Sequence, residues 1–259
     1  MCIRDSVLMY GCGIGPVNGE ASRKRAARVI DRNVDAITLR EDLSAEELKT
    51  MGVTKPKVYV TADPALLLEA GSEGAVDGFL LGNNIDPAGR YALFVLREWQ
   101  GFEAKKQAFV QSAKYVKDAY GLTPIFFALE PGRDLPPSRE VARELPFECP
   151  MLSAPADEKL IIGMMKKMQV VVSMRLHALI FASSVAAPLV AVSYDPKVTG
   201  FMHYIGQKHC VYFEDVTAEN LCALIDGALT ERSEYSVDRL RALAAQNEEI
   251  AKELLEEPI

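Results

Sequence analysis

The stretch Met174–Pro196, MRLHALIFASSVAAPLVAVSYDP, carries the pattern that decides the fold. An apolar run, VVV at 170–172, comes just before it, and a second run, LVAV at 189–192, lies inside it. Short apolar runs bounded by polar or turn residues are typical of buried strands. Between the two runs the apolar residues follow helical spacing. The stretch therefore predicts a strand, a helix and a second strand parallel to the first.

Polar side chains with useful chemistry follow both predicted strands. They are Ser173, Arg175 and His177 after the first strand, and Ser193, Tyr194 and Asp195 after the second. Ligands of such units bind outside the carboxyl ends of the strands. A guanidinium, an imidazole and the amides of a helix N-terminus together suit a multiply charged anion with a proton donor beside it. The pattern alone also fits a plainer interpretation, in which the arginine pairs with a neighbouring acid and the histidine belongs to the core.

The same region, SMRLHALIFASSVAAPLVAVSYDPKVTGFM at 173–202, resembles the C-terminal signature of the polysaccharide pyruvyl transferases, in particular the bacterial cell-surface-anchoring type. Three more stretches are similar to that family in the expected order: YGCGIGP at 10–16, ITLRED at 37–42 and TADPAL at 61–66. The resemblance covers nearly the whole chain. Residues 1–6, MCIRDS, do not match the family and are interpreted as a non-native leader, so we expect an N-terminally truncated fragment.

Strand and helix patterns alternate along the whole chain, which predicts the α/β class. Further strands are expected at 7–10, 34–39, 57–61, 91–96, 123–129 and 211–213, the last at a sheet edge. Further helices are expected at 20–32, 102–120, 157–167, 197–206, 217–229 and 236–255. Another helix, ending near Met51, is expected to open with a capping box formed by Ser44 and Glu47.

Glycines and polar residues between 69 and 90 predict a domain boundary. We expect the remainder of an N-terminal lobe at 7–78, a C-terminal lobe at 79–230, and a helix at 231–259 that packs back on the first lobe. The resemblance implies that both lobes are Rossmann-like and face each other across a cleft in a GT-B-like arrangement, with the first lobe incomplete. It implies an acceptor side in the N-terminal lobe and a donor side in the C-terminal lobe.

The composition is that of an ordinary soluble globular protein. The chain has 259 residues, of which 49% are hydrophobic and 25% charged, with a formal net charge of −7. This charge argues against a nucleic acid or an anionic membrane as the main partner. Five scattered cysteines without a C-x-x-C pair predict reduced thiols. Since no stretch suits a signal peptide or a membrane span, a cytoplasmic location is expected.

No cofactor and no metal are expected from the motifs. The run GCGIGP at 11–16 lacks the G-x-G-x-x-G spacing of a dinucleotide site, so it predicts a tight loop at a strand end. No Asp-x-Asp pair and no His/Cys cluster has the spacing of a metal site. An anionic co-substrate would instead need a local group of cations.

The resemblance implies a reaction with phosphoenolpyruvate, in which a pyruvate ketal is placed across two hydroxyls of one sugar. It implies donor contacts at Arg97, Arg175, Leu176 and His177, with Leu176 contributing only its backbone. His177 is expected to act as general acid and base beside Arg175, because an imidazole both gives and takes protons near neutrality. Further candidates for the cleft or the acceptor are Gly13, Gly15, Arg40, Asp63, Asp134, Tyr194 and Asp195. For Asp195, capping of the following helix is the favoured interpretation.

The acceptor implied by the resemblance is a sugar of a cell-wall polysaccharide or of its lipid-linked precursor at the inner membrane face. For the surface-anchoring type this is a secondary cell-wall polysaccharide with an N-acetylmannosamine unit, whose ketal is recognised by surface-layer proteins. Two alternatives stay open. One is a GT-B glycosyltransferase with a nucleotide-sugar donor, whose diphosphate could use the same cations. The other is an inactive fragment.

Overall fold

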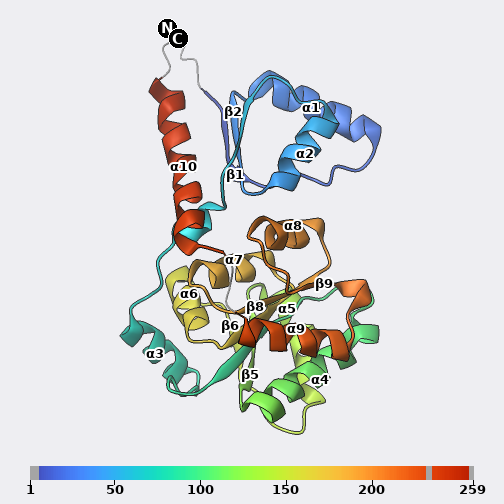
Figure 1. Cartoon of the computed structure of the whole chain (residues 1–259), viewed down its shortest axis with the longest axis vertical. Helices are drawn as coiled ribbons and strands as arrows, with labels where there is room; N and C mark the ends of the chain where they lie inside the picture. The colour runs from blue at the N-terminus through green and yellow to red at the C-terminus, as the bar shows by residue number, and fades with distance from the viewer. Residues whose placement is uncertain (1–5, 232–234, 257–259) are drawn as a thin grey trace. The chain divides into compact units, whose positions relative to one another are not determined.

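The computed structural model describes residues 6–231 and 235–256, and these form two compact units (Figure 1). Unit 1 consists of the chain up to Leu67 together with the residues from Asp238 onward, and unit 2 is Leu68–Val237. Of the expected leader at 1–6, all but Ser6 lies outside the described residues. The fold class is α/β, with one parallel sheet in each unit.

Unit 2 is built on a six-stranded sheet in which every neighbouring pair is parallel. Its strands are β4 (Tyr91–Val95), β5 (Thr123–Ala128), β6 (Met151–Ser153), β7 (Val170–Ser173), β8 (Leu189–Ser193) and β9 (Cys210–Tyr212). The order across the sheet is β6-β5-β4-β7-β8-β9, with β9 at an edge as expected. In chain order this is 3-2-1-4-5-6, the Rossmann arrangement, and its switch point lies between β4 and β7.

Helices cover both faces of this sheet. They are α3 (Glu73–Gly82), α4 (Phe102–Tyr120), α5 (Pro131–Arg143), α6 (Glu158–Lys166), α7 (Leu176–Ser184), α8 (Pro196–Tyr204) and α9 (Ala218–Thr230). Helices α4, α5 and α9 share one core cluster with the strands. Helices α7 and α8 pack on β7 and β8 outside that cluster, and α7 contacts both α6 and α8. Along β4, Ala92 and Phe94 point into that cluster while Leu93 and Val95 do not, yet all four are fully buried. Because these strands are buried on both faces, their sequences are continuous apolar runs rather than alternating apolar and polar residues.

Unit 1 holds a three-stranded parallel sheet in the order β1-β2-β3. Its elements are β1 (Leu8–Cys12), α1 (Glu20–Asn33), β2 (Ala36–Leu39), α2 (Asp42–Met51), β3 (Lys57–Val60), the 3₁₀ turn η1 (Pro64–Leu67) and α10 (Val237–Glu256). The core lies between the sheet and the two helices α1 and α2, and its buried members are Ala27, Ile37, Leu39, Leu48 and Met51. The predicted helices and strands of this unit are thus present within a few residues of their expected ends.

The expected capping box of α2 is wrong. The helix begins at Asp42, and the carboxylate of Glu41 caps it by accepting a hydrogen bond from the Ser44 amide. Ser44 Oγ instead accepts from the amide of Ile14 at 2.7 Å, and Glu47 Oε1 accepts from the amide of Val17 at 3.1 Å. Both residues therefore hold the glycine-containing loop after β1, whose backbone amides would otherwise lack partners.

The division between the units differs from the expected boundary at 78/79. It falls between Leu67 and Leu68, because α3 packs against α6 and so belongs to unit 2. The Gly71 amide donates to the Lys159 carbonyl at 2.7 Å, and Lys167 pairs with Asp77 at 2.8 Å. The sequence pattern missed α3 because three glycines, which are poor helix formers, lie within it. It also missed α5, which follows β5 where only a loop was expected.

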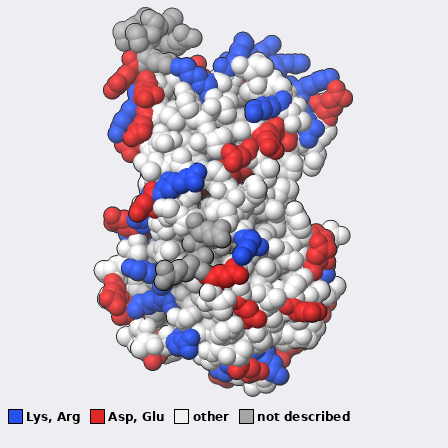
Figure 2. Space-filling model, viewed as in Figure 1, with Lys and Arg blue, Asp and Glu red and all other residues white. Residues whose placement is uncertain are grey.

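Two general expectations can be compared with the described residues. Cys12, Cys149, Cys210 and Cys222 are unpaired thiols, and burial raises the pKa of Cys149 and of Cys210 to about 11. Cys2 lies outside the described residues. None of the described helices has the length and apolar character needed to cross a bilayer. Figure 2 shows lysine and arginine interspersed with aspartate and glutamate over the face drawn, unlike the basic face of a nucleic-acid-binding protein.

We predict that Asn247→Leu destabilises unit 1. The buried amide of Asn247 accepts from Thr61 Oγ1 at 2.9 Å and donates to the carbonyl of Ala62 at 2.9 Å, which ties α10 to the end of β3. Leucine leaves these buried polar groups with fewer partners, at a cost of about 2 kcal/mol. Native-state hydrogen exchange of the β1–β3 amides measures the loss. Gln246→Leu, at an exposed position of the same helix, is the matched control and is expected to leave exchange unchanged.

Candidate active site

Two arginines emerge at equivalent positions from the neighbouring strands β4 and β7. Val95 and Ser173 are register partners at the ends of these strands, and Arg97 and Arg175 each follow two residues later. This is the switch point of the sheet, where open α/β folds bind their ligands. The side chains of Arg97 and Arg175 are only 14% and 13% exposed. The resemblance implied donor contacts at both Arg97 and Arg175, and the structure brings these two cations to one place.

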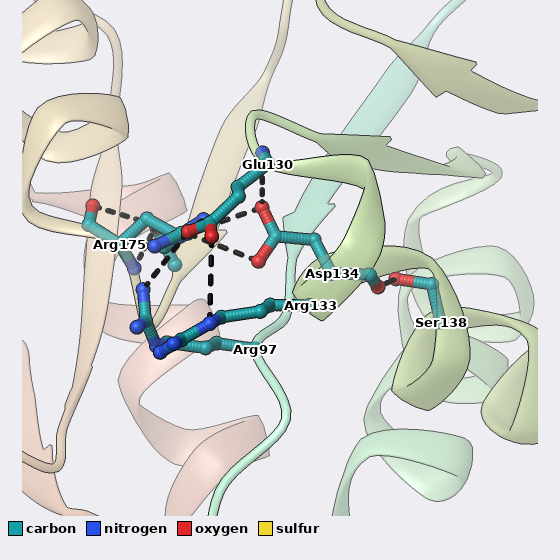
Figure 3. Close-up of polar contacts among 7 residues, drawn as sticks. Arg97, Glu130, Arg133, Asp134, Ser138 and Arg175 are labelled. Atoms are coloured by element: carbon teal, nitrogen blue, oxygen red, sulfur yellow. Dashed lines mark hydrogen bonds and ion pairs between the residues drawn. The ribbon is translucent and has the colours of Figure 1, made fainter.

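Both arginines converge on acidic side chains from the first turn of α5 (Figure 3). Glu130 Oε2 lies 2.7 Å from Arg175 Nη2 and 3.7 Å from Arg97 Nη1. Glu130 Oε1 lies 3.4 Å from Nε of the exposed Arg133. Arg175 Nε also lies 3.0 Å from Oδ1 of Asp134, whose side chain is fully buried. We call these five residues the arginine cluster.

Asp134 orients Arg175, whereas Glu130 occupies a place that a ligand can take. The Asp134 carboxylate accepts from the Glu130 amide at 2.8 Å and from Arg175 Nε at 3.1 Å. Burial raises its pKa to about 6, against the opposing effects of the Glu130 amide and the Arg97 charge. The Glu130 side chain is 52% exposed and is surrounded by three guanidiniums. A more highly charged anion entering from solvent can replace it there, because guanidiniums bind phosphate and carboxylate oxygens in the same geometry.

The start of α7 adds donors beside the cluster. Arg175 is the N-cap residue, and its side chain does not cap the helix. The first amides of α7, beginning with Leu176, have no acceptor within the helix because of helix geometry. The Leu176 side chain is buried, so only its backbone could serve a ligand. His177 follows and is exposed, with its ring 6.4 Å from that of Phe181.

Tyr194 and Asp195, at the end of β8, have different roles. The Tyr194 ring lies 5.5 Å from the Arg97 guanidinium carbon and 4.5 Å from the Trp99 ring, so it packs beside the arginine cluster. Asp195 caps α8 by accepting from the Lys197 amide at 3.0 Å, and it pairs with Lys197 Nζ at 3.3 Å. The favoured interpretation of Asp195 as a helix cap is therefore confirmed.

The other candidates form a separate group in unit 1. Arg40 Nη1 lies 3.2 Å from Asp63 Oδ2, and both side chains are largely buried. Gly13 lies so close to Arg40 that an added Cβ would be 2.9 Å from its Nε. Gly15 has φ +85° and packs against Glu47, where an added Cβ would meet the side chain at 2.7 Å. The positive φ thus favours glycine at position 15, whereas a larger residue at position 13 would require the Arg40 side chain to shift.

Some features of the site were not foreseen. Glu130 and Arg133 were not among the predicted site residues, although charged residues directly after a buried strand were a usable signal. Nothing among residues 6–231 and 235–256 accepts a hydrogen bond from the buried Nε of Arg97, which leaves that N–H for a ligand. In the same ranges, no group of three or more His, Cys, Asp or Glu side chains is placed to hold a metal ion.

Solved structures share this fold at low sequence identity. A UDP-GlcNAc 2-epimerase from Methanocaldococcus jannaschii superposes with a TM-score of 0.68 at 13% identity, covering 96% of this chain and 70% of that one. Anabaena HepE, in complex with UDP and glucose, gives a TM-score of 0.61 at 14% identity, covering 97% and 72%. A glycosyltransferase from Rickettsia africae gives 0.62 at 13% identity, covering 95% and 70%. At such identities the likeness establishes the fold alone.

Fold and site together define an α/β protein of the GT-B-like class with cations gathered at the switch point of one sheet. A family model described as polysaccharide pyruvyl transferase matches residues 3–196, which is most of the chain and includes four of the six residues that were expected not to match the family. The chain belongs to the polysaccharide pyruvyl transferase family, and the resemblance noted from its motifs is confirmed at that level.

We predict that sulfate binds the arginine cluster more tightly as the pH falls through about 6. Burial places the pKa of Asp134 at about 6, above its ordinary 3.8. The folded protein therefore binds this proton more tightly than the unfolded chain does. The contribution of Asp134 to the free energy of unfolding falls as the pH rises from 3.8 through about 6. Below pH 6 the protonated carboxyl no longer neutralises Arg175, so sulfate affinity rises about threefold to tenfold.

Calorimetric titration of sulfate across this range measures the effect, since sulfate keeps its charge there. Asp134→Asn is expected to remove the pH dependence. His177→Gln is the control, because an imidazole also titrates near neutrality. A dependence that survives in Asp134→Asn and disappears in His177→Gln would assign the effect to the histidine instead.

Proposed function

We propose that this chain transfers a pyruvyl group from phosphoenolpyruvate to a sugar of a cell-wall polysaccharide or of its lipid-linked precursor, forming a pyruvate ketal. One observation carries the proposal: Arg97 and Arg175, from register-matched ends of β4 and β7, converge on one carboxylate oxygen of Glu130. The donor carries a phosphate and a carboxylate, and each suits a planar guanidinium. Membership of the pyruvyl transferase family supports this assignment over other anions.

The donor is proposed to displace Glu130 from the arginine cluster. Its anionic groups would take hydrogen bonds from Arg97 and Arg175, including the buried Arg97 Nε, and from the first amides of α7. Asp134 would keep Arg175 in orientation throughout, because its carboxylate is buried behind that side chain. The binding groups are thus arranged before the donor arrives, which lowers the cost of ordering them.

His177 is proposed to handle the protons of the reaction. A proton goes to the methylene carbon of the enol, and the carbon that bears the phosphate becomes an oxocarbenium-like centre. One sugar hydroxyl attacks that carbon and loses its proton. The carbon–oxygen bond to phosphate then breaks with its electron pair on phosphate, and the second hydroxyl attacks and loses its proton. An exposed imidazole at the second position of α7, beside Arg175, can serve as the acid and the base.

The proposal extends to the biological setting only through the family. We infer three features from the motifs around 173–202: an acceptor sugar with two suitably placed hydroxyls, the surface-anchoring subtype, and action in the bacterial cytoplasm at the inner membrane face.

The competing proposal, a glycosyltransferase with a nucleotide-sugar donor, draws on fold likeness to proteins such as Anabaena HepE. That likeness is at 14% identity, so it adds no residue-level support.

We predict that phosphoenolpyruvate binds this chain and that Arg175→Ala weakens binding about 100-fold, as expected for the loss of charge-assisted hydrogen bonds. Isothermal calorimetry makes the measurement. Arg139→Ala, at an exposed position of α5, is the matched control and should bind as the wild type does. Binding of UDP-sugars in place of phosphoenolpyruvate, with the same loss in Arg175→Ala, would favour the glycosyltransferase.

We predict that His177→Gln lowers turnover by about 10²–10⁴-fold, the usual contribution of general acid–base catalysis. Phosphoenolpyruvate affinity should change little, because Arg97 and Arg175 remain. Phosphate release with a sugar acceptor measures turnover, and calorimetry measures binding. His203→Gln, at another exposed histidine, is the control. Turnover that persists in His177→Gln would show that another group carries the protons.

A further inference from the structure

A cavity of about 280 Å³ lies in unit 2 beside the arginine cluster. It is formed by the loop after β4, the start of α4 and the middle of α5, and the residues that matter here are Glu98, Trp99, Phe102, Glu103, Pro136 and Glu140. In contrast to the acceptor side that the resemblance implied in the N-terminal lobe, we propose that this cavity of unit 2 binds one neutral sugar ring, the acceptor unit or its neighbour in the polysaccharide. The inference rests on the proposed function, because it assigns the second substrate of the same site.

The cavity is held against the arginine cluster by two contacts. Glu98 directly follows Arg97, and its amide donates to the Arg133 carbonyl at 2.8 Å. That carbonyl is available because Pro137, one helical turn later in α5, has no N–H to bond it. On the other side, the Trp99 ring packs at 4.5 Å on Tyr194, which itself lies over the Arg97 guanidinium. Two lining residues, Glu98 and Trp99, therefore connect the cavity to Arg97 through the chain and through Tyr194.

The lining has the chemistry that a sugar ring requires. Trp99 is 38% exposed, and its indole face can pack against the C–H groups of a pyranose ring. The carboxylates of Glu98, Glu103 and Glu140 are hydrogen-bond acceptors for sugar hydroxyls. The volume is near the lower limit of about 300 Å³ for small-molecule sites, which suits a single ring.

The charge of the lining separates the two substrates. Three of the lining residues are glutamates. Among the described residues, no lysine or arginine lines the cavity. Glu103 is partly neutralised by Lys106, whose Nζ lies 2.6 Å from its Oε1. The cavity thus repels the phosphate and carboxylate that the arginine cluster attracts. A neutral polyhydroxylated ligand meets no such repulsion.

The test uses the fact that Trp99 is the only tryptophan of the chain, so its emission reports on this cavity. Methyl glycosides of neutral hexoses and of N-acetylhexosamines are titrated against the protein, with choline and phosphoenolpyruvate as comparison ligands. At least one glycoside should change the emission saturably. Glu140→Gln should weaken that glycoside about tenfold, through the loss of a hydrogen bond to a charged acceptor. Glu219→Gln, at an exposed position of α9, is the control.

These measurements test the phosphoenolpyruvate site and the sugar cavity independently of each other. Arg175→Ala should weaken phosphoenolpyruvate binding about 100-fold and leave glycoside affinity within about twofold, whereas Glu140→Gln should weaken the glycoside about tenfold and leave phosphoenolpyruvate affinity within about twofold. If phosphoenolpyruvate binds and no glycoside does, by emission or calorimetry, the sugar cavity is refuted and the proposed function stands. If choline alone binds, the cavity is a cation site and the inference is likewise refuted. If glycosides bind with the expected loss in Glu140→Gln but phosphoenolpyruvate does not, the cavity is supported and the donor assignment falls.

Discussion

The buried ion pair between Asp134 and Arg175 is the constraint on which the site depends. Asp134 has no exposed surface, and an ionised carboxylate in such a place is tolerated only with close partners. Here the partners are the Glu130 amide and the guanidinium of Arg175. Arg175 is also the N-cap residue of α7. The pair therefore links the first turn of α5 to the start of α7, across the ends of β5, β4 and β7.

Two neighbouring carboxylates have different environments and so different roles. Asp134 is enclosed and acts on the orientation of Arg175, whereas Glu130 is half exposed and is held by a hydrogen bond from Arg175 and by ion pairs with its neighbours. A half-exposed ion pair contributes little to stability, so exchanging Glu130 for a doubly charged ligand costs little. Before a ligand binds, Glu130 also reduces the repulsion among three guanidiniums. The cluster can thus be preassembled without an unpaired concentration of positive charge.

Much of this architecture is predictable from local pattern, and some is not. The β7-α7-β8 unit follows from apolar runs and helical spacing, and Arg97 and Arg175 follow from their places after buried strands. The contact of both arginines with Glu130 depends on the strand order. Glu130 follows β5, and in the sheet β4 lies between β5 and β7, an order that differs from the order along the chain. Helix α5 contains Pro136 and Pro137, which argue against a helix locally. The Arg133 carbonyl that Pro137 leaves without its helical partner accepts a hydrogen bond from the Glu98 amide instead. Similarly, Ser44 and Glu47 match a capping pattern, yet loop amides compete successfully for both side chains.

The path of the chain between its two units has a practical consequence. Unit 2 is one continuous segment, Leu68–Val237, whereas unit 1 is assembled from both ends of the chain. Asn247 near the C-terminus is hydrogen-bonded to Thr61 and Ala62, so the last helix completes the first sheet. Unit 2 can therefore be excised as a single polypeptide, but unit 1 can be isolated only by joining its two segments with a new linker. A C-terminal deletion would damage the fold at the beginning of the chain and spare the sheet that carries the arginines.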